Sequence, residues 1–488
     1  MYYKGKSTIL KKEFSPINLL FFGLGNILGP QIFIMLAGLI AIADIYGIFT
    51  LIICSLICYL IAMAYLELAM CMPVVGVVVN SVNDAFGAFT SFLVGWSQVF
   101  SNISFAAVCA IGFGMFLGKP LIGAIIIVII VSILELKGIS GIEKIDKLLV
   151  ISMLGFFAVI FVANISNLSA ITQLSFSFAE QSNLRKILLG MGFFFLAFTN
   201  FEDLTTYAEE MQDIKKLPRV MFSTVTIVSI LFILIYLVLI GAIGSHSASL
   251  EAPLEFLSSK VFGSISLYII TIIGMIASIS SLMGSLSSSS RNIFSLAEIG
   301  FLPKKLRSIT AQGIPINAIG LATLFALMII LSGGLELVIY LANFIYFFVT
   351  FFVCITVIKL RGKRKKLERP FKIPLFPIPP LVTAVAVISL MFFLEMQSIG
   401  LGLVWIFVGF IIYILRIVGE FRLKLAIFGA TIITWVIIII AFLILRESVP
   451  NATFALIPVF IASQILFIVF SYLQILDIKE FRKKIADN

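Results

Sequence analysis

The chain has 488 residues, of which 61% are hydrophobic and 12% charged, with a mean hydropathy of +1.19 and a formal net charge of +10. Soluble domains carry about 25% charged residues, so the composition excludes a water-soluble globular protein. It predicts an all-α polytopic membrane protein.

Fourteen apolar segments are expected to span the membrane. They cover residues 17–42, 47–71, 88–117, 120–136, 148–165, 187–208, 220–244, 262–290, 314–332, 335–358, 379–396, 401–415, 425–445 and 453–475. An even number of spans places both termini on one side. All 34 Lys and Arg residues lie on that side except Lys119, Arg185, Lys186, Lys260 and Arg446. The positive-inside rule therefore predicts cytoplasmic termini in a multi-pass protein of the cell membrane, and the positive charge indicates topology, not binding of nucleic acid.

The first span contains Gly23, Gly25 and Gly29, followed by Pro30 and the polar Gln31. Three glycines and a proline disfavour a continuous helix. One interpretation is a broken helix whose freed peptide groups face a substrate at membrane depth, as in many secondary transporters. The alternative is close helix packing through small residues. Pro30 beside Gln31 favours the break.

Two further polar residues lie in the second and third spans. Glu67 is either functional or paired with a neighbouring helix end or a basic loop, and the sequence favours the pairing. Asn102 needs a partner inside the membrane, either as a contact between helices or as a pocket residue.

The sixth span is the second unusual segment, because the aromatic run from Phe193 to Phe198 is followed by Thr199, Asn200, Glu202 and Asp203. Each acidic residue costs roughly 2.5–3.5 kcal/mol at the centre of a bilayer, which indicates a polar cavity or a helix end beside it. Each successive span reverses direction, and span 6 is the fifth span after span 1. Spans 1 and 6 therefore run in opposite directions. Two interrupted helices in oppositely oriented halves are typical of inverted-repeat transporters.

Span 8 ends in a serine-rich run that includes Ser285, Ser287 and Ser288. These hydroxyls either bond to their own helix and bend it, or bind a small cation together with carbonyls freed in span 1. The basic loop 359–378 is interpreted as a topology anchor that contacts anionic membrane lipids. The single histidine, His246, lies in a predicted outer loop, and no nucleotide-binding loop is present. The sequence therefore predicts neither an enzyme nor a pump, and it implies no catalytic residue, cofactor or metal other than a possible sodium ion.

In these motifs the chain resembles the amino acid–polyamine–organocation permeases. Residues 23–33 resemble the family's G-x-G-x-x-x-G-S-G-x-F, and residues 65–87 resemble its Y-x-E-L…P…G…A-F-G. Residues 198–210 resemble F-x-G-F-E…A-E-E, and the ordered set continues through residues 291–303 and 369–371. Asn26 and Asn102 also resemble positions in arginine/agmatine-type antiporters of this family.

The resemblance implies a LeuT-like core of ten helices in two inverted repeats of five, with discontinuous helices 1 and 6. The first repeat would cover residues 16–165 after a cytoplasmic segment 1–15, and the second residues 187–358. Spans 11–14 would follow in 379–475, with a cytoplasmic tail at 476–488. In the family, main-chain N–H groups of span 1 hold the substrate carboxylate, and carbonyls of spans 1 and 6 hold the ammonium.

Two departures concern the substrate. Pro30 and Gln31 replace the family's Ser-Gly, and proline lacks an N–H to give to a carboxylate. Asn200 stands where span 6 usually has glycine. Both changes leave amines, or substrates with altered carboxylate geometry, open as candidates.

We therefore expect a secondary active transporter that moves an amino acid or related amine by alternating access. The alternatives are a polyamine or amine exchanger and a sodium-coupled carrier of a non-amino solute on the same fold. Glu202, Ser287 and Ser288 are candidates for coupling to protons or sodium, and Gly23, Gly25 and Gly29 for the helix break. The expected substrate-binding residues are Asn26, Ile27, Gly29, Pro30, Gln31, Asn102, Ala197, Phe198, Thr199, Asn200 and Ser285.

Overall fold

A computed structural model describes residues 14–136, 139–173, 181–243, 253–310, 313–331, 335–394 and 396–417. It divides into a unit of residues Met1–Phe410 and a second unit, Ile411–Asn488, of which only the end of the last helix is described. The described residues form helices joined by turns and irregular segments, and they contain no β-strand apart from one isolated bridge between Phe14 and Met211. The predicted spans 425–445 and 453–475 lie outside the described residues.

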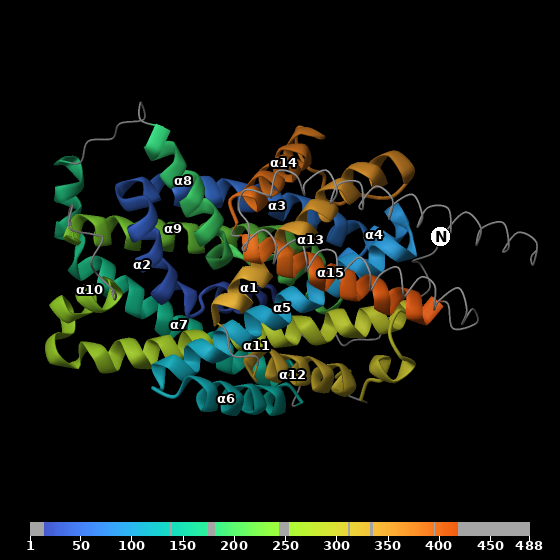
Figure 1. The fold of residues 1–488 in the computed structure, drawn as a ribbon, viewed down its shortest axis with the longest axis horizontal. Coiled ribbons are helices and arrows are strands. Elements are labelled where there is room, and N and C mark those ends of the chain that lie inside the picture. The colour runs from blue at the N-terminus through green and yellow to red at the C-terminus, as the bar shows by residue number, and fades with distance from the viewer. Residues whose placement is uncertain are drawn as a thin grey trace, which may run out of the picture. The chain divides into compact units, whose positions relative to one another are not determined.

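The helices follow one another in the order shown in Figure 1. In the first part of the chain they are α1 (Pro16–Ile27), α2 (Gln31–Ala43), α3 (Gly47–Cys71), α4 (Val77–Phe86), α5 (Ala88–Phe116), α6 (Pro120–Glu135) and α7 (Ile139–Ala163). In the second part they are α8 (Gln181–Phe194), α9 (Leu217–Ile243), α10 (Pro253–Phe262), α11 (Ser266–Ile299), α12 (Ile316–Leu331), α13 (Leu335–Lys363), α14 (Ile378–Phe392) and α15 (Met396–Ile417). Short 3₁₀ segments join them, including η2 (Ile165–Gln173), η3 (Phe195–Phe198) and η4 (Glu202–Glu210).

Seven of the described helical segments are long and apolar enough to cross a membrane, and five shorter apolar helices accompany them. This confirms an all-helical chain of the kind found in polytopic membrane proteins, while the total of fourteen spans and the two-repeat relation stay predictions. Two helices were not expected. α4 and α10 are ten residues each, which is too short to cross a bilayer, so a search for long apolar runs passes over them.

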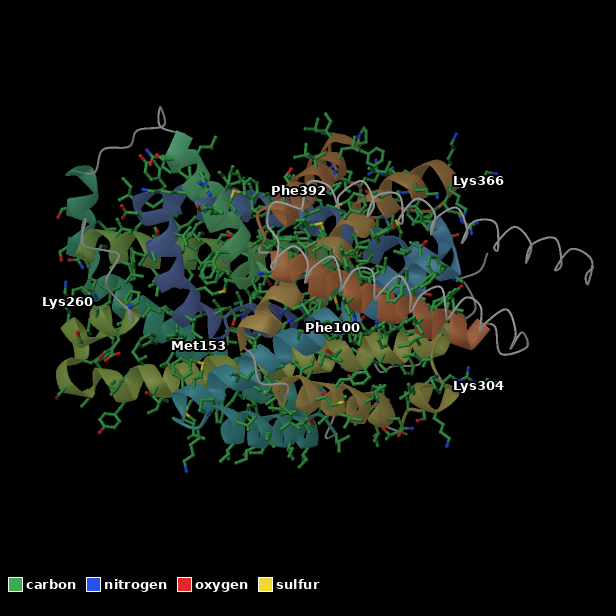
Figure 2. The ribbon with its side chains drawn as sticks, viewed as in Figure 1. Phe100, Met153, Lys260, Lys304, Lys366 and Phe392 are labelled. Carbon is green, nitrogen blue, oxygen red and sulfur yellow. The ribbon has the colours of Figure 1, made fainter. Side chains whose placement is uncertain are left out.

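The interior of the first unit is built around α5, which packs along α11 and α13 and also contacts α4, α6 and α12 (Figure 1). Phe100 on α5 lies in this interior in Figure 2 and packs with Phe344 and Ile345 of α13. Trp96 of α5 stacks on Trp405 of α15, with ring centroids 4.9 Å apart. Polar residues carried by α5 and α11 are therefore held inside the bundle.

The outer surface of the helices is apolar. On α6, Ile122 is 57% exposed and Ile133 is 54% exposed, and Val385 on α14 is 64% exposed. Apolar side chains in such a continuous surface are suited to lipid rather than to water. Figure 2 also shows Lys260 at one end of the bundle and Lys304 and Lys366 at the other.

Candidate functional site at two helix breaks

The first break lies between α1 and α2. α1 ends at Ile27, whose carbonyl accepts the N–H of Gly29 at 2.9 Å, and α2 begins at Gln31 after a turn through Pro30. The N–H of Phe33 donates to the carbonyl of Pro30 at 3.0 Å. Helical bonding is therefore interrupted at residues 28–30. Pro30 contributes because it cannot supply an N–H to continue α1.

The break does not extend to Gly23 and Gly25, which lie within α1, so this part of the prediction is corrected. A Cβ built at Gly23 would lie 2.9 Å from both methyl carbons of Leu204, and one at Gly25 would lie 2.8 Å from a carboxylate oxygen of Asp146. These two glycines allow neighbouring segments to approach α1 closely. Gly29 lies in the break itself.

The second break follows α8. The 3₁₀ segment η3 ends at Phe198, Thr199 is extended, and Asn200 adopts a left-handed φ of 76° before η4 begins at Glu202. Asparagine tolerates this conformation better than other residues with a side chain, and glycine tolerates it without cost. The local geometry thus explains why asparagine can stand where the resembling family has glycine.

Alanine at position 200 is therefore expected to be about 1–2 kcal/mol less stable than glycine at the same position, the cost of a left-handed residue with a Cβ. Glycine at the same position is expected to be at least as stable as asparagine. Thermal unfolding of Asn200→Ala and Asn200→Gly in detergent measures the difference. Equal stability of the two variants would contradict the assignment of strain to this residue.

The two breaks are joined by Asn26, a buried residue of α1. Its Nδ2 donates to the carbonyl of Asn200 at 2.9 Å and to Oδ2 of Asp203 at 3.3 Å. Asn102 of α5 donates to the other oxygen of Asp203 at 2.9 Å, and Ser285 Oγ of α11 lies 3.2 Å from Asn26 Oδ1. The structure thus brings four of the predicted residues into one network.

Asp203 accepts hydrogen bonds from both asparagine side chains of this network, and it is not among the binding residues expected from the sequence. It lies in η4 and is 1% exposed. Its position directly after Glu202, in a polar cluster within an apolar span, was the signal that could have identified it. Glu202 itself is 4% exposed and accepts a long hydrogen bond from Tyr346 at 3.5 Å.

Some buried polar atoms at the breaks have no hydrogen-bond partner among the described residues. They include both amide atoms of Gln31 and Nδ2 of Asn200. Gln31 is 3% exposed and Asn200 is 2% exposed, and unsatisfied buried amides cost about 1–3 kcal/mol each. Such atoms can be satisfied by a bound polar molecule.

Three other residues expected at the site, Ala197, Phe198 and Thr199, make contacts outside the network of Asn26. Ala197 and Phe198 are buried in η3, where the ring of Phe198 packs against Phe232 with centroids 5.0 Å apart. Thr199 Oγ1 donates to the carbonyl of Leu196 at 2.8 Å.

The serines of α11 form hydrogen bonds with other side chains, with a carbonyl of α1, or with carbonyls of α11 itself. Ser287 Oγ accepts a hydrogen bond from Arg291 at 2.7 Å, and Ser288 Oγ lies 3.2 Å from the hydroxyl of Tyr207. The serine that contacts a carbonyl of α1 is Ser281, whose Oγ donates to Gly25 at 2.7 Å. The contact expected of Ser287 and Ser288 is thus made by a serine nearer the start of α11. Ser289 and Ser285 bond back to their own helix, as the first interpretation of the serine-rich run describes.

Ion pairs at two buried carboxylates, Glu210 and Glu67, hold the surrounding elements. Arg291 of α11 forms hydrogen bonds of 2.5 and 3.0 Å with the carboxylate of Glu210 in η4. Glu67 of α3 accepts from Arg361 at 2.7 Å and from the N–H of Ile373 at 2.9 Å, with Arg369 3.4 Å away. Pairing of Glu67 with the basic loop is thereby confirmed. No group of His, Cys, Asp and Glu able to hold a metal ion occurs in the part of the chain that is described.

Apolar helices with two breaks linked inside the bundle are typical of membrane transport proteins. The family model described as "Amino acid permease" matches residues 14–415. The chain belongs to this amino acid permease family, within the amino acid–polyamine–organocation superfamily.

Relatives with assigned names are distant. The chain is 25% identical to the branched-chain amino acid permease BcaP of Lactococcus lactis subsp. cremoris, in an alignment that covers 46% of this chain and 49% of that protein. It is 22% identical to the methylthioribose transporter of Bacillus subtilis over 84% of this chain and 95% of that protein. It is 23% identical to the branched-chain amino acid permease BcaP of Bacillus subtilis over 83% and 93%, respectively. These findings indicate a transporter of amino acids or related substrates rather than an enzyme.

Proposed function

We propose that the protein is a secondary active transporter that binds an amino acid or related amine between the two helix breaks and moves it by alternating access. The observation that carries the proposal is the link from Asn26 to Asn200, beside the unpartnered amides of Gln31 and Asn200. Peptide groups at helix ends bind charged substrate groups, anions at N-termini and cations at C-termini. The carbonyl end of α1 favours an ammonium, and the carboxyl oxygens of Asp203 add hydrogen-bond acceptors in the same place.

The proposal is tested with a thermal-shift screen of the purified protein. The compounds are neutral and basic amino acids, their decarboxylated amines, and polyamines. A hit is then followed by exchange of the labelled compound in proteoliposomes without an imposed gradient. Stabilisation and exchange by at least one amino acid or amine is expected, because a ligand that binds the folded state raises its stability. Failure of every compound in both assays would contradict the proposal.

A second candidate is a carrier of a solute without an amino group. It is favoured by Pro30, which removes one N–H from the α1–α2 turn, and by the similarity to a protein named as a methylthioribose transporter. Methylthioribose is therefore included in the screen. Stabilisation by methylthioribose that amino acids do not reduce in competition would support this candidate over the first, and a requirement for sodium would identify it as sodium-coupled.

The double substitution Pro30→Ser and Gln31→Gly is expected to change the ranking of ligands toward α-amino acids. Serine restores an N–H donor in the turn, and glycine removes an amide that lies within the break. One recovered hydrogen bond to a charged group is worth about 1.5–3 kcal/mol, so the affinity for a carboxylated ligand relative to its decarboxylated amine is expected to rise about tenfold or more.

The control is the single substitution Gly320→Ala on α12, where an added methyl group meets no atom within 4 Å. It is expected to leave the ranking as in the parent protein. An unchanged ranking in the double variant would show that residues 30 and 31 do not select the ligand.

A further inference from the structure

Asp146 is a buried acid in the interior that the site described above does not use. It lies on α7 and is 1% exposed. Ser280 Oγ of α11 donates to its Oδ1, whereas Oδ2 has no hydrogen-bond partner among the described residues. Gly25 of α1 lies against both oxygens, because a Cβ built there would be 2.8 and 2.9 Å from them. Three helices therefore meet at this carboxyl group.

No described basic side chain forms an ion pair with Asp146. On α7 itself, Lys144 is exposed and Lys147 lies over the ring of Phe21, 5.3 Å from its centroid. α1, α2 and η2 contain no ionisable residue. The charge of an ionised Asp146 thus has no described partner on its own helix or on α1.

The other helices packed against α7 carry ionisable groups that are engaged elsewhere or lie outside this contact. Arg291 of α11 is paired with Glu210, Tyr236 of α9 donates to the carbonyl of Asp44, and Lys260 of α10 lies over the ring of Phe256. These helices and α6 carry five more ionisable residues, and none of them forms a described hydrogen bond or ion pair with Asp146. They are Glu135, Arg219, Glu255, Tyr268 and Glu298.

An ionised carboxylate in these surroundings is costly, by several kcal/mol without a compensating cation. A proton on Oδ2 removes the charge and requires no added space. Larger cations need several oxygen ligands at once, and the close approach of Gly25 and Ser280 disfavours them. The geometry therefore favours a proton over a metal cation.

We propose that Asp146 is a proton-binding site that couples proton movement to transport; this inference rests on the function proposed above. Gly25 lies in the last turns of α1 before the break, and its carbonyl is held by Ser281, the neighbour of Ser280. With Oδ2 protonated, α1, α7 and α11 remain packed together. Release of the proton to water leaves a carboxylate that must be hydrated, so α1 separates from α11 as the proton leaves.

The protonation state is tested without any substrate by infrared spectroscopy of the purified full-length protein. The wild type is expected to show a protonated-carboxyl C=O band near neutral pH that Asp146→Asn lacks. Glu135→Gln is the matched control, because Glu135 of α6 is also a buried carboxyl without a described partner. It is expected to retain the component that Asp146→Asn removes. Identical carboxyl bands in the wild type and Asp146→Asn would overturn the proposal.

Ser280→Ala provides a second variant that keeps the acid. The Ser280 hydroxyl donates to Oδ1 and stabilises the charged form more than the neutral form. Its removal is expected to keep the Asp146 band visible at a higher pH than in the wild type. A band that disappears at the same or a lower pH would contradict the assignment, and this result does not depend on whether Asp146→Asn folds.

Coupling is measured in proteoliposomes with radiolabelled L-leucine. An inward proton gradient of about one pH unit is expected to drive about tenfold accumulation in the wild type. In Asp146→Asn the gradient is expected to drive none, while exchange without a gradient continues. Gradient-driven accumulation by this variant, or none by a wild type that exchanges leucine, would overturn the coupling. If the wild type does not exchange leucine, the same gradient experiment is made with the compound that the thermal-shift screen identifies. Failure of every compound in that screen would count against the proposed function, and the infrared result would still decide whether Asp146 holds a proton.

Discussion

Arg291→Met is expected to lower the free energy of unfolding by about 3–5 kcal/mol, because it leaves the buried carboxylate of Glu210 without its partner. The side chains of this pair are 8% and 2% exposed, respectively. The guanidinium also donates to Ser287 and lies 4.6 Å from the ring centroid of Tyr207. Thermal unfolding of the detergent-purified protein measures the loss.

Arg364→Met is the matched control for this experiment. Arg364 is also paired with a carboxylate, that of Asp84, at 2.7 Å, but its side chain is 49% exposed. Exposed pairs contribute about 0–1 kcal/mol, so the control is expected to unfold close to the parent protein. The double variant Arg291→Met, Glu210→Met removes both buried charges and is expected to recover much of the stability. Similar losses in Arg291→Met and Arg364→Met would refute this account.

Gly284→Ala is expected to reduce transport by about fivefold to 150-fold. A Cβ at this position of α11 would lie 2.6 Å from Cγ of Asn26, so the Asn26 amide must move away from Asn200 and Asp203. Loss of these buried hydrogen bonds costs about 1–3 kcal/mol, which corresponds to the stated range of rates. Exchange of the compound identified by the thermal-shift screen gives the rate.

The control for the added methyl group is again Gly320→Ala, at a position open to its surroundings. It is expected to exchange at the parent rate. If Gly284→Ala also exchanged at that rate while remaining folded, the link between the two breaks would not be needed for transport.

The sequence allowed the first break to be predicted but not its extent. Pro30 indicated an interruption because proline removes a helical hydrogen bond. Gly23 and Gly25 are equally compatible with a break and with close packing, and the choice depends on which side chains approach them. Leu204 and Asp146 are far from them in sequence, so no local pattern distinguishes the two roles.

The burial of Asp146 could not be predicted from the sequence, for a different reason. The predicted fifth span begins at residue 148, since the charged residues before it resemble a loop, whereas α7 begins at Ile139. Helix α7 thus carries Asp146 into the packed interior, where its burial depends on α1 and α11. Asp203 was recognised as a buried acid, but its two asparagine partners come from α1 and α5. Contacts between such distant segments depend on how the helices pack, and this packing cannot be predicted from a single sequence.

The short segment η4 is fastened unequally at its two ends. Near Glu210 it is held by Arg291 and by backbone pairing with Phe14, whose N–H donates to Glu210 at 3.1 Å and whose carbonyl accepts from Gln212 at 3.0 Å. Near Asn200 the neutral amides of Asn26 and Asn102 make the contacts. The ion pair and the backbone pairing thus hold the Glu210 end of the segment, whereas a rearrangement at the Asn200 end requires only that side-chain amide hydrogen bonds be exchanged.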